Sequence, residues 1–335
     1  MKRAGGLYPA IADRDNLLAA CHAARSGKQD RPAVLAFTAD LDYQIELLRR
    51  ELLVEDVQLR GYRFFTIHDP KPRRIAAPAF RDRVLHHAIV QVIEPELERV
   101  AVFDSYACRK GKGLYRAIDR TQQFCRRHSH YLQLDIRKYF DSIDHAVLRE
   151  LLARRFKDRA LLALLGRIVD SYATAPEVGL PIGALTSQHL ANFYLAPLDH
   201  FAKEELRVPG YVRYMDDFLL FGDDLEMLRG TRARVEAFVT ERLRLRLKNA
   251  GELDEIRRGV GYLGMLVRAS HVRLLGKTKR RVRARLRELV QRHAHGQVGD
   301  AELALRTTAM LARTHHVRAR GLRRGWIAEF ADVDA

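Results

Sequence analysis

Two adjacent carboxylates, Asp216 and Asp217, stand between two apolar stretches at 211–214 and 218–221 that are rich in β-forming residues. This pattern predicts a β-hairpin with both acids at its tip. Adjacent aspartates repel each other, and an ordinary surface turn more often uses Asp-Gly or Asn-Gly. A divalent cation that neutralised the pair would account for the pattern. An acidic loop that merely follows a strand has the same pattern, and these residues alone do not decide between the two.

A third carboxylate, Asp135, ends an apolar stretch over 131–134 that predicts a β-strand. A carboxylate at a strand end is well placed to share a metal ion with acids on a neighbouring hairpin. The nearby Asp141 and Asp144 are interpreted instead as a turn residue and as the N-cap of a helix over 146–154. Asp135 is therefore the candidate third acid of the site.

Length and composition are those of a globular protein. The chain has 335 residues, enough for two or three lobes around a sizeable core. No apolar run approaches the roughly 20 residues that span a bilayer, and the basic N-terminus leads into no apolar segment. Three scattered cysteines are too few for a disulfide framework or a four-ligand zinc site. These features predict a cytoplasmic protein without a membrane partner.

The net charge of +17 predicts a polyanionic partner, for which nucleic acid is the first candidate. A basic balance that serves solubility alone is the alternative. The charge is concentrated near the C-terminus, where residues 271–335 hold 15 Lys and Arg against 6 Asp and Glu. Seven of these basic residues lie between Lys277 and Arg287, on a segment whose apolar residues share one helical face. This distribution favours a phosphate-binding helical surface.

Helices and short strands are expected around the acidic residues. Apolar residues spaced among charged ones predict helices within 11–60, and an amphipathic helix that begins at residue 81 should end near Pro95. A Gly/Pro turn over 179–183 leads into a further helix. The stretch 261–267 is expected to form one short strand.

Two basic segments could contact phosphate groups. Residues 62–78 predict two strands around a proline-rich turn, with Lys71, Arg73 and Arg74 in the turn and the return strand. Such a hairpin could close over a triphosphate, although an ordinary solvated hairpin has the same pattern. The glycine-containing loop over 103–113 lacks the spacing of a P-loop. Its amides suit a nucleic-acid backbone, as do its basic side chains Arg109, Lys110 and Lys112.

Taken in order, these stretches resemble a reverse transcriptase over roughly residues 60–335. Five blocks in the family's order carry the resemblance: the basic hairpin, Leu134-Asp135 with Phe140, Leu180-Pro181-Ile182-Gly183 with Ser187-Gln188, Tyr214-Met215-Asp216-Asp217, and Tyr262-Leu263-Gly264. The resemblance implies an α+β, right-hand polymerase with fingers, a palm built on an antiparallel sheet, and a helical thumb. The implied divisions are an N-terminal helical extension (1–60), fingers (61–130), a palm (131–267, with 148–189 contributing partly to the fingers) and a basic helical thumb (268–335).

The resemblance also implies residue roles. Asp135 and Asp216, with the backbone carbonyl of Ile136, would hold two Mg²⁺ ions, for which Mn²⁺ could substitute, and Asp217 would support them. The implied nucleotide-binding residues are Lys71, Arg74 (with Arg73 as its alternative), Phe140, Ile182, Gln188 and Lys248. Among these, Phe140 would exclude a ribose 2′-hydroxyl, and Lys248 would lie near the pyrophosphate. The implied primer and template contacts are Arg109, Lys110, Lys112, Tyr214, Tyr262, Gly264, Lys279, Arg280 and Arg283.

One block departs from the most familiar members of the family. Retroviral and group II intron enzymes usually read Pro-Gln-Gly and end in Ser-Pro, whereas this chain reads Pro181-Ile182-Gly183 and ends in Ser187-Gln188. This form resembles the reverse transcriptases of diversity-generating retroelements, as does the loop over 105–113. That resemblance implies dNTPs, a template RNA copied through an RNA/DNA hybrid, errors opposite template adenine and a small helical-bundle accessory protein. The short chain agrees, since no maturase, DNA-binding or endonuclease module is expected after the thumb.

Three other interpretations stay open on the sequence. The chain could be a retron-type, group II-like or defence-associated reverse transcriptase, which genome neighbours would distinguish. It could be an RNA-dependent RNA polymerase, although those more often carry Gly-Asp-Asp and Phe140 favours deoxynucleotides. A non-catalytic RNA-binding protein is the third, and the intact set of three aspartates argues against it.

Overall fold

A four-stranded antiparallel sheet lies at the centre of the chain, and the acidic residues are carried by it. The computed structural model describes residues 2–68, 71–249, 251–312, 314, 317 and 319–331. The sheet has the strand order β4-β5-β3-β6, in which every neighbouring pair is antiparallel. The strands are β4 (Gly210–Tyr214), β5 (Asp217–Gly222), β3 (His130–Asp135) and β6 (Glu252–Glu255).

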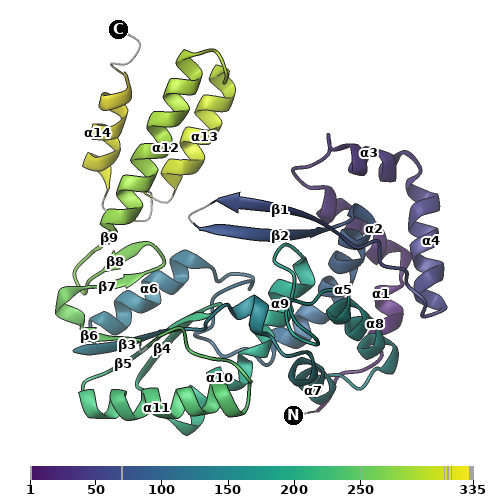
Figure 1. Cartoon of the computed structure of the whole chain (residues 1–335), viewed down its shortest axis with the longest axis horizontal. Helices are drawn as coiled ribbons and strands as arrows, with labels where there is room; N and C mark the ends of the chain where they lie inside the picture. The colour runs from purple at the N-terminus through teal and green to yellow at the C-terminus, as the bar shows by residue number, and fades with distance from the viewer. Residues whose placement is uncertain are drawn as a thin grey trace.

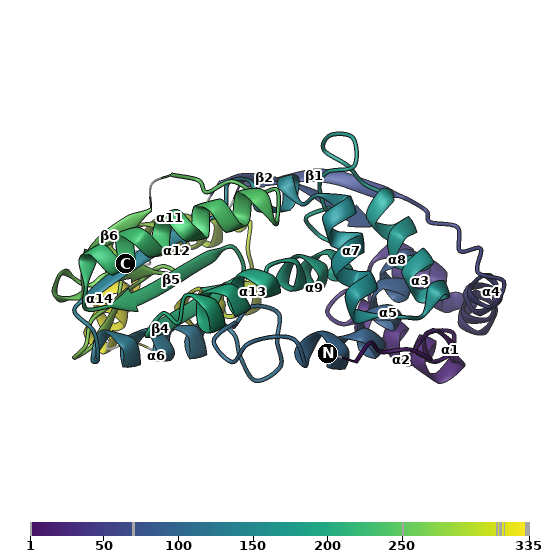
Figure 2. The ribbon, with the colours of Figure 1, turned by 90° about the horizontal axis from the view of Figure 1, so that it is seen from below.

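Both faces of this sheet are buried, which explains why its central strands are apolar without strict alternation. On β3, Leu132 and Leu134 enter the larger hydrophobic cluster, whereas Tyr131 points into a second one. On β5, Phe218 and Leu220 likewise alternate with Leu219 and Phe221 between the two clusters. The helix α11 (Leu225–Glu241) contacts β3 and β5, and α6 (Leu114–Cys125) contacts β4. In Figure 1 these two helices lie on opposite faces of the sheet, and Figure 2 shows α11 running along β5.

Four helices precede the first strand, in agreement with the prediction of helices within residues 11–60. They are α1 (Tyr8–Ile11), α2 (Arg14–Arg25), α3 (Pro32–Ala39) and α4 (Leu41–Leu53). The helices α1, α2 and α3 all contact α5 (Phe80–Glu98). Asp13 caps α2 by accepting hydrogen bonds from the amides of Asp15 and Asn16.

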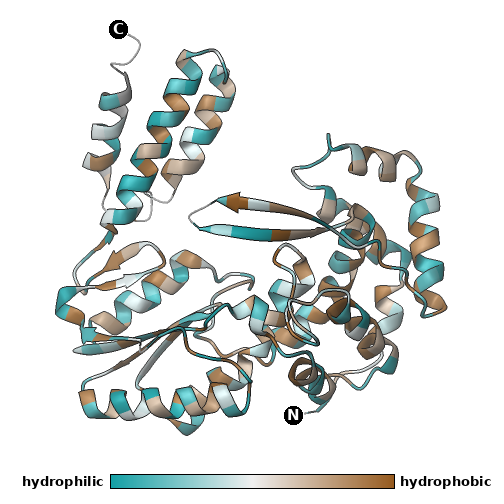
Figure 3. Cartoon of the chain, in the orientation of Figure 1, coloured by the Kyte–Doolittle hydropathy of each residue, from teal (hydrophilic) through white to brown (hydrophobic). Residues whose placement is uncertain are grey.

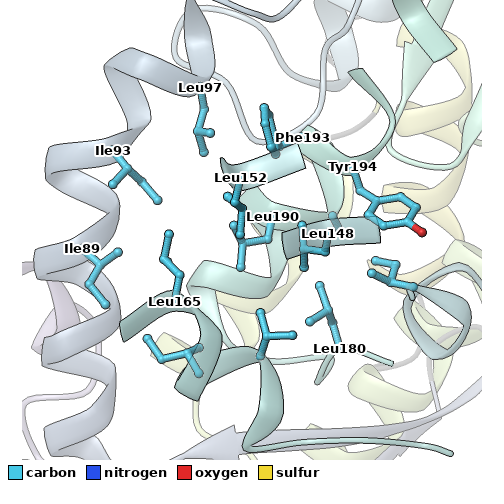
Figure 4. Packing of buried hydrophobic residues seen from close by; sticks show 14 of the residues in the cluster. Ile89, Ile93, Leu97, Leu148, Leu152, Leu165, Leu180, Leu190, Phe193 and Tyr194 are labelled. Carbon is cyan, nitrogen blue, oxygen red and sulfur yellow. The ribbon is translucent and has the colours of Figure 1, made fainter. Parts of the chain in front are cut away.

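The prediction that α5 ends near Pro95 is wrong, because the helix continues to Glu98 with Pro95 inside it. Proline removes only one backbone hydrogen bond of the helix. The burial of apolar side chains before and after Pro95 stabilises the helix and offsets that loss. Ile93 and Leu97 pack into the main core, with 0% and 8% of their surface exposed. Figure 4 shows them beside Ile89 on the same helix, facing the other helices of this lobe.

The helices α1–α5 form one lobe together with α7 (His145–Arg155), α8 (Arg159–Asp170) and α9 (Leu185–Tyr194). The core of this helical lobe lies between α5, α7, α8 and α9. The N-cap predicted at Asp144 is confirmed, since its carboxylate accepts from the amide of Val147 at 3.0 Å. Leu148, Leu152, Leu165 and Leu190 meet in its centre (Figure 4). The remaining short elements are η1 (Tyr139–Ser142), α10 (Ala196–His200), η2 (Phe201–Glu205) and η3 (Ile256–Arg258).

The segment 261–267 forms two strands where one was predicted. A three-stranded sheet joins β7 (Val260–Tyr262), β8 (Met265–Val267) and β9 (Val272–Leu274), with Leu263 and Gly264 in the turn between the first two. Both turn residues have positive φ, 48° for Leu263 and 83° for Gly264, which a continuous strand does not allow. The apolar run therefore folds back on itself at the glycine.

Within the described residues, three helices follow this small sheet, in agreement with the helical pattern predicted for the basic C-terminal segment. They are α12 (Gly276–Ala294), α13 (Asp300–Ala312) and α14 (Arg320–Ala331). Val282 and Leu286 of α12 join the second hydrophobic cluster together with Trp326 of α14. Figure 3 shows hydrophilic residues along much of the rest of α12. No helix in the described part of the chain is long and apolar enough to cross a membrane.

The predicted basic hairpin is confirmed as β1 (Tyr62–His68) and β2 (Pro72–Pro78), paired from Tyr62–Pro78 to His68–Pro72. In Figure 1 it reaches from the helical lobe toward α12 and α13. Phe64 and Phe65 point to opposite faces of this two-stranded ribbon, yet they are 46% and 41% exposed. Both faces of the hairpin are therefore open to a ligand. The divisions at residues 60, 130 and 267 stay predictions, although α6 precedes residue 130 and already packs on β4 and β8.

Candidate active site

The three aspartates meet at one end of the central sheet. Tyr214 and Asp217 are paired across the β4–β5 hairpin, so Met215 and Asp216 form its two-residue turn. Asp217 is also paired with Asp135 on the other side of β5. The amide of Ile136 donates to the carbonyl oxygen of Asp216 at 3.3 Å, which ties the turn to the end of β3. The predicted hairpin and the predicted strand end thus place all three carboxylates together.

Electrostatic repulsion and burial dominate this end of the sheet. Burial, and then repulsion from Asp135, raise the pKa of Asp216 to about 6. Burial raises the pKa of Asp217 to about 7, with added repulsion from Asp135 and Asp216. A hydrogen bond from Gln133 Nε2 to Asp217 Oδ1, at 2.9 Å, opposes that rise. The site therefore holds negative charge that its own side chains only partly neutralise.

Lys248 supplies the nearest positive charge. Its Nζ donates to Asp135 Oδ2, and its backbone amide donates to the carbonyl of Asp135 at 2.9 Å. The hydrogen bond to Asp135 raises the pKa of Lys248 above its usual value. The lysine predicted to lie near the pyrophosphate is thus beside the acidic cluster, where it pairs with one of the predicted metal ligands.

The donor set fits a hard divalent cation. Carboxylate and backbone carbonyl oxygens are the ligands that Mg²⁺ and Mn²⁺ prefer, and the raised pKa values of Asp216 and Asp217 mark a place where added positive charge is favourable. Within the described residues, however, no three His, Cys, Asp or Glu side chains already form a metal cage. A metal ion bound by Asp135 would compete with Lys248, which pairs with one oxygen of that carboxylate.

The predicted nucleotide-binding residues are carried by the hairpin β1–β2 and by the connections around it. The carbonyl of Ile182 accepts from the amide of Ala76 at 2.8 Å, so the loop before α9 is fastened to β2. Gly183 allows this close approach: its φ is +128°, and a Cβ atom would lie 2.9 Å from the carbonyl oxygen of Ala76. An open pocket lies between β2 and η1, lined in part by Arg73, Arg74, Lys138, Tyr172 and Ile182.

Arg73 and Arg74 point to opposite faces of β2, and the structure favours Arg73 as the residue that faces the acids. The positive charge of Arg73 lowers the pKa of Asp216. The guanidinium of Arg74 lies 4.2 Å from the ring centre of Phe64, in a cation–π contact. These contacts favour Arg73, the stated alternative to Arg74, and the assignment of either residue to the triphosphate stays a prediction. Lys71 lies exposed in the hairpin turn.

Two other predicted nucleotide contacts lie on η1 and on α9. Phe140 lies in η1, with its ring edge-to-face against Tyr139 at 5.8 Å between ring centres. Its carbonyl accepts from the amide of Leu180 at 2.8 Å, which fastens η1 to the Gly/Pro turn. Gln188 is exposed on α9, where its Oε1 lies 3.8 Å from the thiol of Cys108.

The three basic side chains of the 103–113 loop, which were predicted to contact nucleic acid, differ in exposure and in pairing. Arg109 pairs with Glu98 at 2.5 Å and donates to the carbonyls of Val102 and Ser105, and its side chain is only 7% exposed. Its guanidinium is engaged by these groups, and the predicted phosphate contact stays a prediction. Lys110 pairs with Glu94 yet is 89% exposed, and Lys112 packs 3.4 Å from the ring centre of Phe103.

The other predicted primer and template contacts differ in burial and in pairing. Tyr262 is buried, and its hydroxyl donates to the carbonyl of Asp217 at 3.0 Å, so its side chain supports the acidic hairpin from below. Gly264 approaches Thr278 of α12, where a Cβ atom would lie 3.2 Å from the hydroxyl oxygen. Arg283 pairs with Glu329 at 2.9 Å. Tyr214 ends β4 against the second hydrophobic cluster, and on α12 Lys279 is partly exposed and Arg280 is exposed.

Sequence reasoning missed the polar residues beneath the acidic turn. Arg213 of β4 is buried and binds Asp199 of α10 and Asn192 of α9, and Gln133 binds Asp217. The only signal in the sequence was a charged residue inside an otherwise apolar strand, since Arg213 stands between Val212 and Tyr214.

Together, the sheet, the three aspartates and the basic hairpin define a right-hand polymerase. A family model for reverse transcriptase (RNA-dependent DNA polymerase) matches residues 68–264, more than half of the chain. The chain therefore belongs to the reverse transcriptase family, and its fold is the one that the sequence predicted.

Curated relatives match parts of the chain. It is similar to Protein YkfC of Escherichia coli (strain K12), with 27% identity over 248 residues, 61% of this chain and 63% of that protein. It is also similar to the group II intron-encoded protein LtrA of Lactococcus lactis subsp. cremoris, with 27% identity over 137 residues, 39% of this chain and 23% of that protein. The chain thus spans less than two thirds of the length of either relative.

Among solved structures, the chain is similar to telomerase from Candida albicans in complex with a fragment of telomeric RNA. The TM-score is 0.49 at 11% identity, covering 70% of this chain and 51% of that chain. Family membership rests on the family match alone.

The raised pKa of Asp217 leads to a prediction for stability. The ordinary pKa of an aspartate is 3.8 and the folded value is about 7, so the folded state binds more protons than the unfolded state between these values. Stability contributed by this group is therefore lost as pH rises through that window. In metal-free buffer at about pH 8, Asp217→Asn should raise Tm by about 1–3 °C, with almost no change at about pH 4. Scanning fluorimetry in EDTA measures this.

Asp223 is the matched control, because hydrogen bonds from His128 and Ser129 lower its pKa. Asp223→Asn should leave Tm unchanged or lower it at the same pH. A lower Tm for Asp217→Asn in EDTA at about pH 8 would contradict the repulsion described for the site.

The two arginines of β2 give a second prediction. Arg73→Ala should raise the KM for dNTP about tenfold, equivalent to about 1.4 kcal/mol, because Arg73 faces the acidic turn. Arg74→Ala is the matched variant on the adjacent residue and opposite face, and should change KM less than about threefold. Steady-state primer extension measures both, and an equal or larger effect of Arg74→Ala would contradict the assignment.

Proposed function

We propose that this chain is an RNA-directed DNA polymerase that extends a primer on an RNA template by nucleotidyl transfer with two Mg²⁺ ions. The observation that carries the proposal is the meeting of Asp135, Asp216 and Asp217 at one end of the palm sheet, beside a basic hairpin. Membership of the reverse transcriptase family supports it.

Each residue of the site would have a separate role in the reaction. When bound, divalent cations would activate the primer 3′-hydroxyl and neutralise charge on the triphosphate. Asp135 and Asp216 would hold those ions through hard oxygen ligands, with the carbonyl of Ile136, and Asp217 would add negative charge behind them. Arg73 would orient the triphosphate from β2, because a guanidinium binds phosphate oxygens in a fixed geometry. Lys248 would place a positive charge near the departing pyrophosphate.

Phe140 would select the sugar. It follows Asp135 by five residues, and η1 is held in place through the hydrogen bond from Leu180 to its carbonyl. An aromatic ring at this place would collide with a ribose 2′-hydroxyl but accept a deoxyribose. This supports a DNA product over an RNA product.

We further propose that the chain serves a diversity-generating retroelement, working in the cytoplasm with a template RNA and a small helical-bundle accessory protein. The Ile182-Gly183 and Ser187-Gln188 forms support this, and Ile182 lines the pocket beside Arg73. A group II-like enzyme is the alternative, favoured by the similarity to LtrA.

Primer extension tests the proposed activity. The wild-type chain should incorporate dNTPs on an RNA template when Mg²⁺ or Mn²⁺ is present, whereas Asp216→Ala should lose at least about a thousandfold of kcat. The Asp216→Ala variant should remain folded, because it removes repulsion at a turn. Extension that persists in Asp216→Ala, or that requires no divalent metal, would contradict the proposal.

The retroelement proposal has its own test at Ile182. Isoleucine lacks the amide with which glutamine could hold an incoming nucleotide, so Ile182→Gln should lower misincorporation opposite template adenine several-fold. Sequencing of the cDNA measures the error at each template base. Errors at template cytosine and guanine serve as the internal control, and an unchanged adenine error rate would contradict the role of Ile182.

A further inference from the structure

A fully buried charge lies directly beneath the acidic turn. Arg213 is the largest of the fully buried side chains, with 1% of its surface exposed, and it lies on β4 one residue before Tyr214. Its partner Asp199 on α10 is 0% exposed. Burying such a pair is unfavourable unless its hydrogen bonds are completed, so each contact of the guanidinium matters.

All five donors of the guanidinium are engaged. Nε and one terminal nitrogen bind the two carboxylate oxygens of Asp199 at 2.6 and 2.5 Å. That nitrogen also donates to the carbonyl of Asn192 at 3.2 Å. The other terminal nitrogen donates to Asn192 Oδ1 and to the carbonyl of Met215, each at 2.9 Å. The guanidinium thus has one fixed orientation, and one of its bonds reaches the turn that carries Asp216.

The turn needs such support because its first residue is in an unfavourable conformation. Met215 has a φ of +58°, in the left-handed region that glycine or asparagine usually occupies. The guanidinium of Arg213 donates a hydrogen bond to the backbone carbonyl of Met215 and so holds this residue in place. Asp216 is the next residue, so the same bond sets where its backbone begins.

Other contacts hold the later residues of the hairpin, and Arg213 holds the first residue of its turn. The amide of Ile136 binds the carbonyl of Asp216, and the hydroxyl of Tyr262 binds the carbonyl of Asp217. The first of these bonds holds the second residue of the turn and the other holds the residue after the turn, whereas Arg213 holds the first turn residue, Met215. Through Asn192 the same guanidinium is joined to α9, which also carries Gln188.

We propose that Arg213 is a positioning residue: its guanidinium holds the left-handed Met215 so that Asp216 stays at the end of the sheet near Asp135, where the two carboxylates can converge on a metal ion. The inference rests on the proposed polymerase function and deepens it. A guanidinium is required because a lysine ammonium cannot reach Asp199, Asn192 and Met215 in one plane. A role confined to stability would not require the bond to Met215.

Binding of Mn²⁺ to the full chain without nucleic acid, followed by electron paramagnetic resonance, tests this directly. Arg213→Lys should weaken Mn²⁺ binding about tenfold, and in primer extension kcat should fall while the KM for dNTP stays within about twofold. Tyr211→Phe is the matched control. It removes a hydroxyl that donates to Asp199 at 2.7 Å in the same cluster, but leaves the bond to Met215 in place. This control should lower Tm without changing Mn²⁺ affinity.

Two further variants test the positioning role even if Arg213→Lys does not fold. The triple variant Asp199→Leu, Tyr211→Phe and Arg213→Met replaces the buried charges by apolar groups, a change that proteins often tolerate. It should fold yet bind Mn²⁺ weakly. Adding Met215→Gly, which accepts a positive φ without strain, should restore much of that affinity.

The outcomes separate the inference from the proposed function. A wild-type chain that neither binds Mn²⁺ nor extends a primer would overturn the proposed function. An active wild type, together with folded Arg213 variants of unchanged Mn²⁺ affinity, would overturn only the positioning role. Failure of Met215→Gly to restore binding in the triple variant would also overturn it.

Discussion

The burial of two carboxylates beside a third is the constraint on which this structure depends, and their mutual repulsion adds to it. Asp135, Asp216 and Asp217 lie at one end of one sheet, where burial and mutual repulsion raise the pKa of the last two. Such an arrangement opposes folding unless positive charge is added. A hard divalent cation is the partner that this donor chemistry suits.

The surrounding fold keeps the acids in place against that repulsion. Hydrophobic clusters on both faces of the sheet fix the register of β3 against β5, and the register decides that Asp135 is opposite Asp217. Tyr262 and Arg213 hold backbone carbonyls of the hairpin from beneath, while Lys248 balances part of the charge from the side. The acidic turn is therefore supported on each side by a different element.

The sequence was informative where a local pattern determines structure, and less so where distant segments meet. The β4–β5 hairpin and the strand end at Asp135 both follow from short apolar runs and their spacing. The choice between Arg73 and Arg74 depends on which face of β2 meets the palm, which no local pattern states.

Packing explains the wrong helix end, since burial of Leu97 carries α5 past Pro95. The pairing of Arg109 with Glu98, at the end of the preceding helix, was likewise not evident from the spacing of the basic loop. A crystal structure with Mn²⁺ and a non-hydrolysable dNTP, with manganese located by anomalous scattering, tests the central claim most directly. We predict manganese bound by both Asp135 and Asp216, with Lys248 no longer paired to Asp135. Manganese absent from these two carboxylates, or bound at a separate site, would contradict the account.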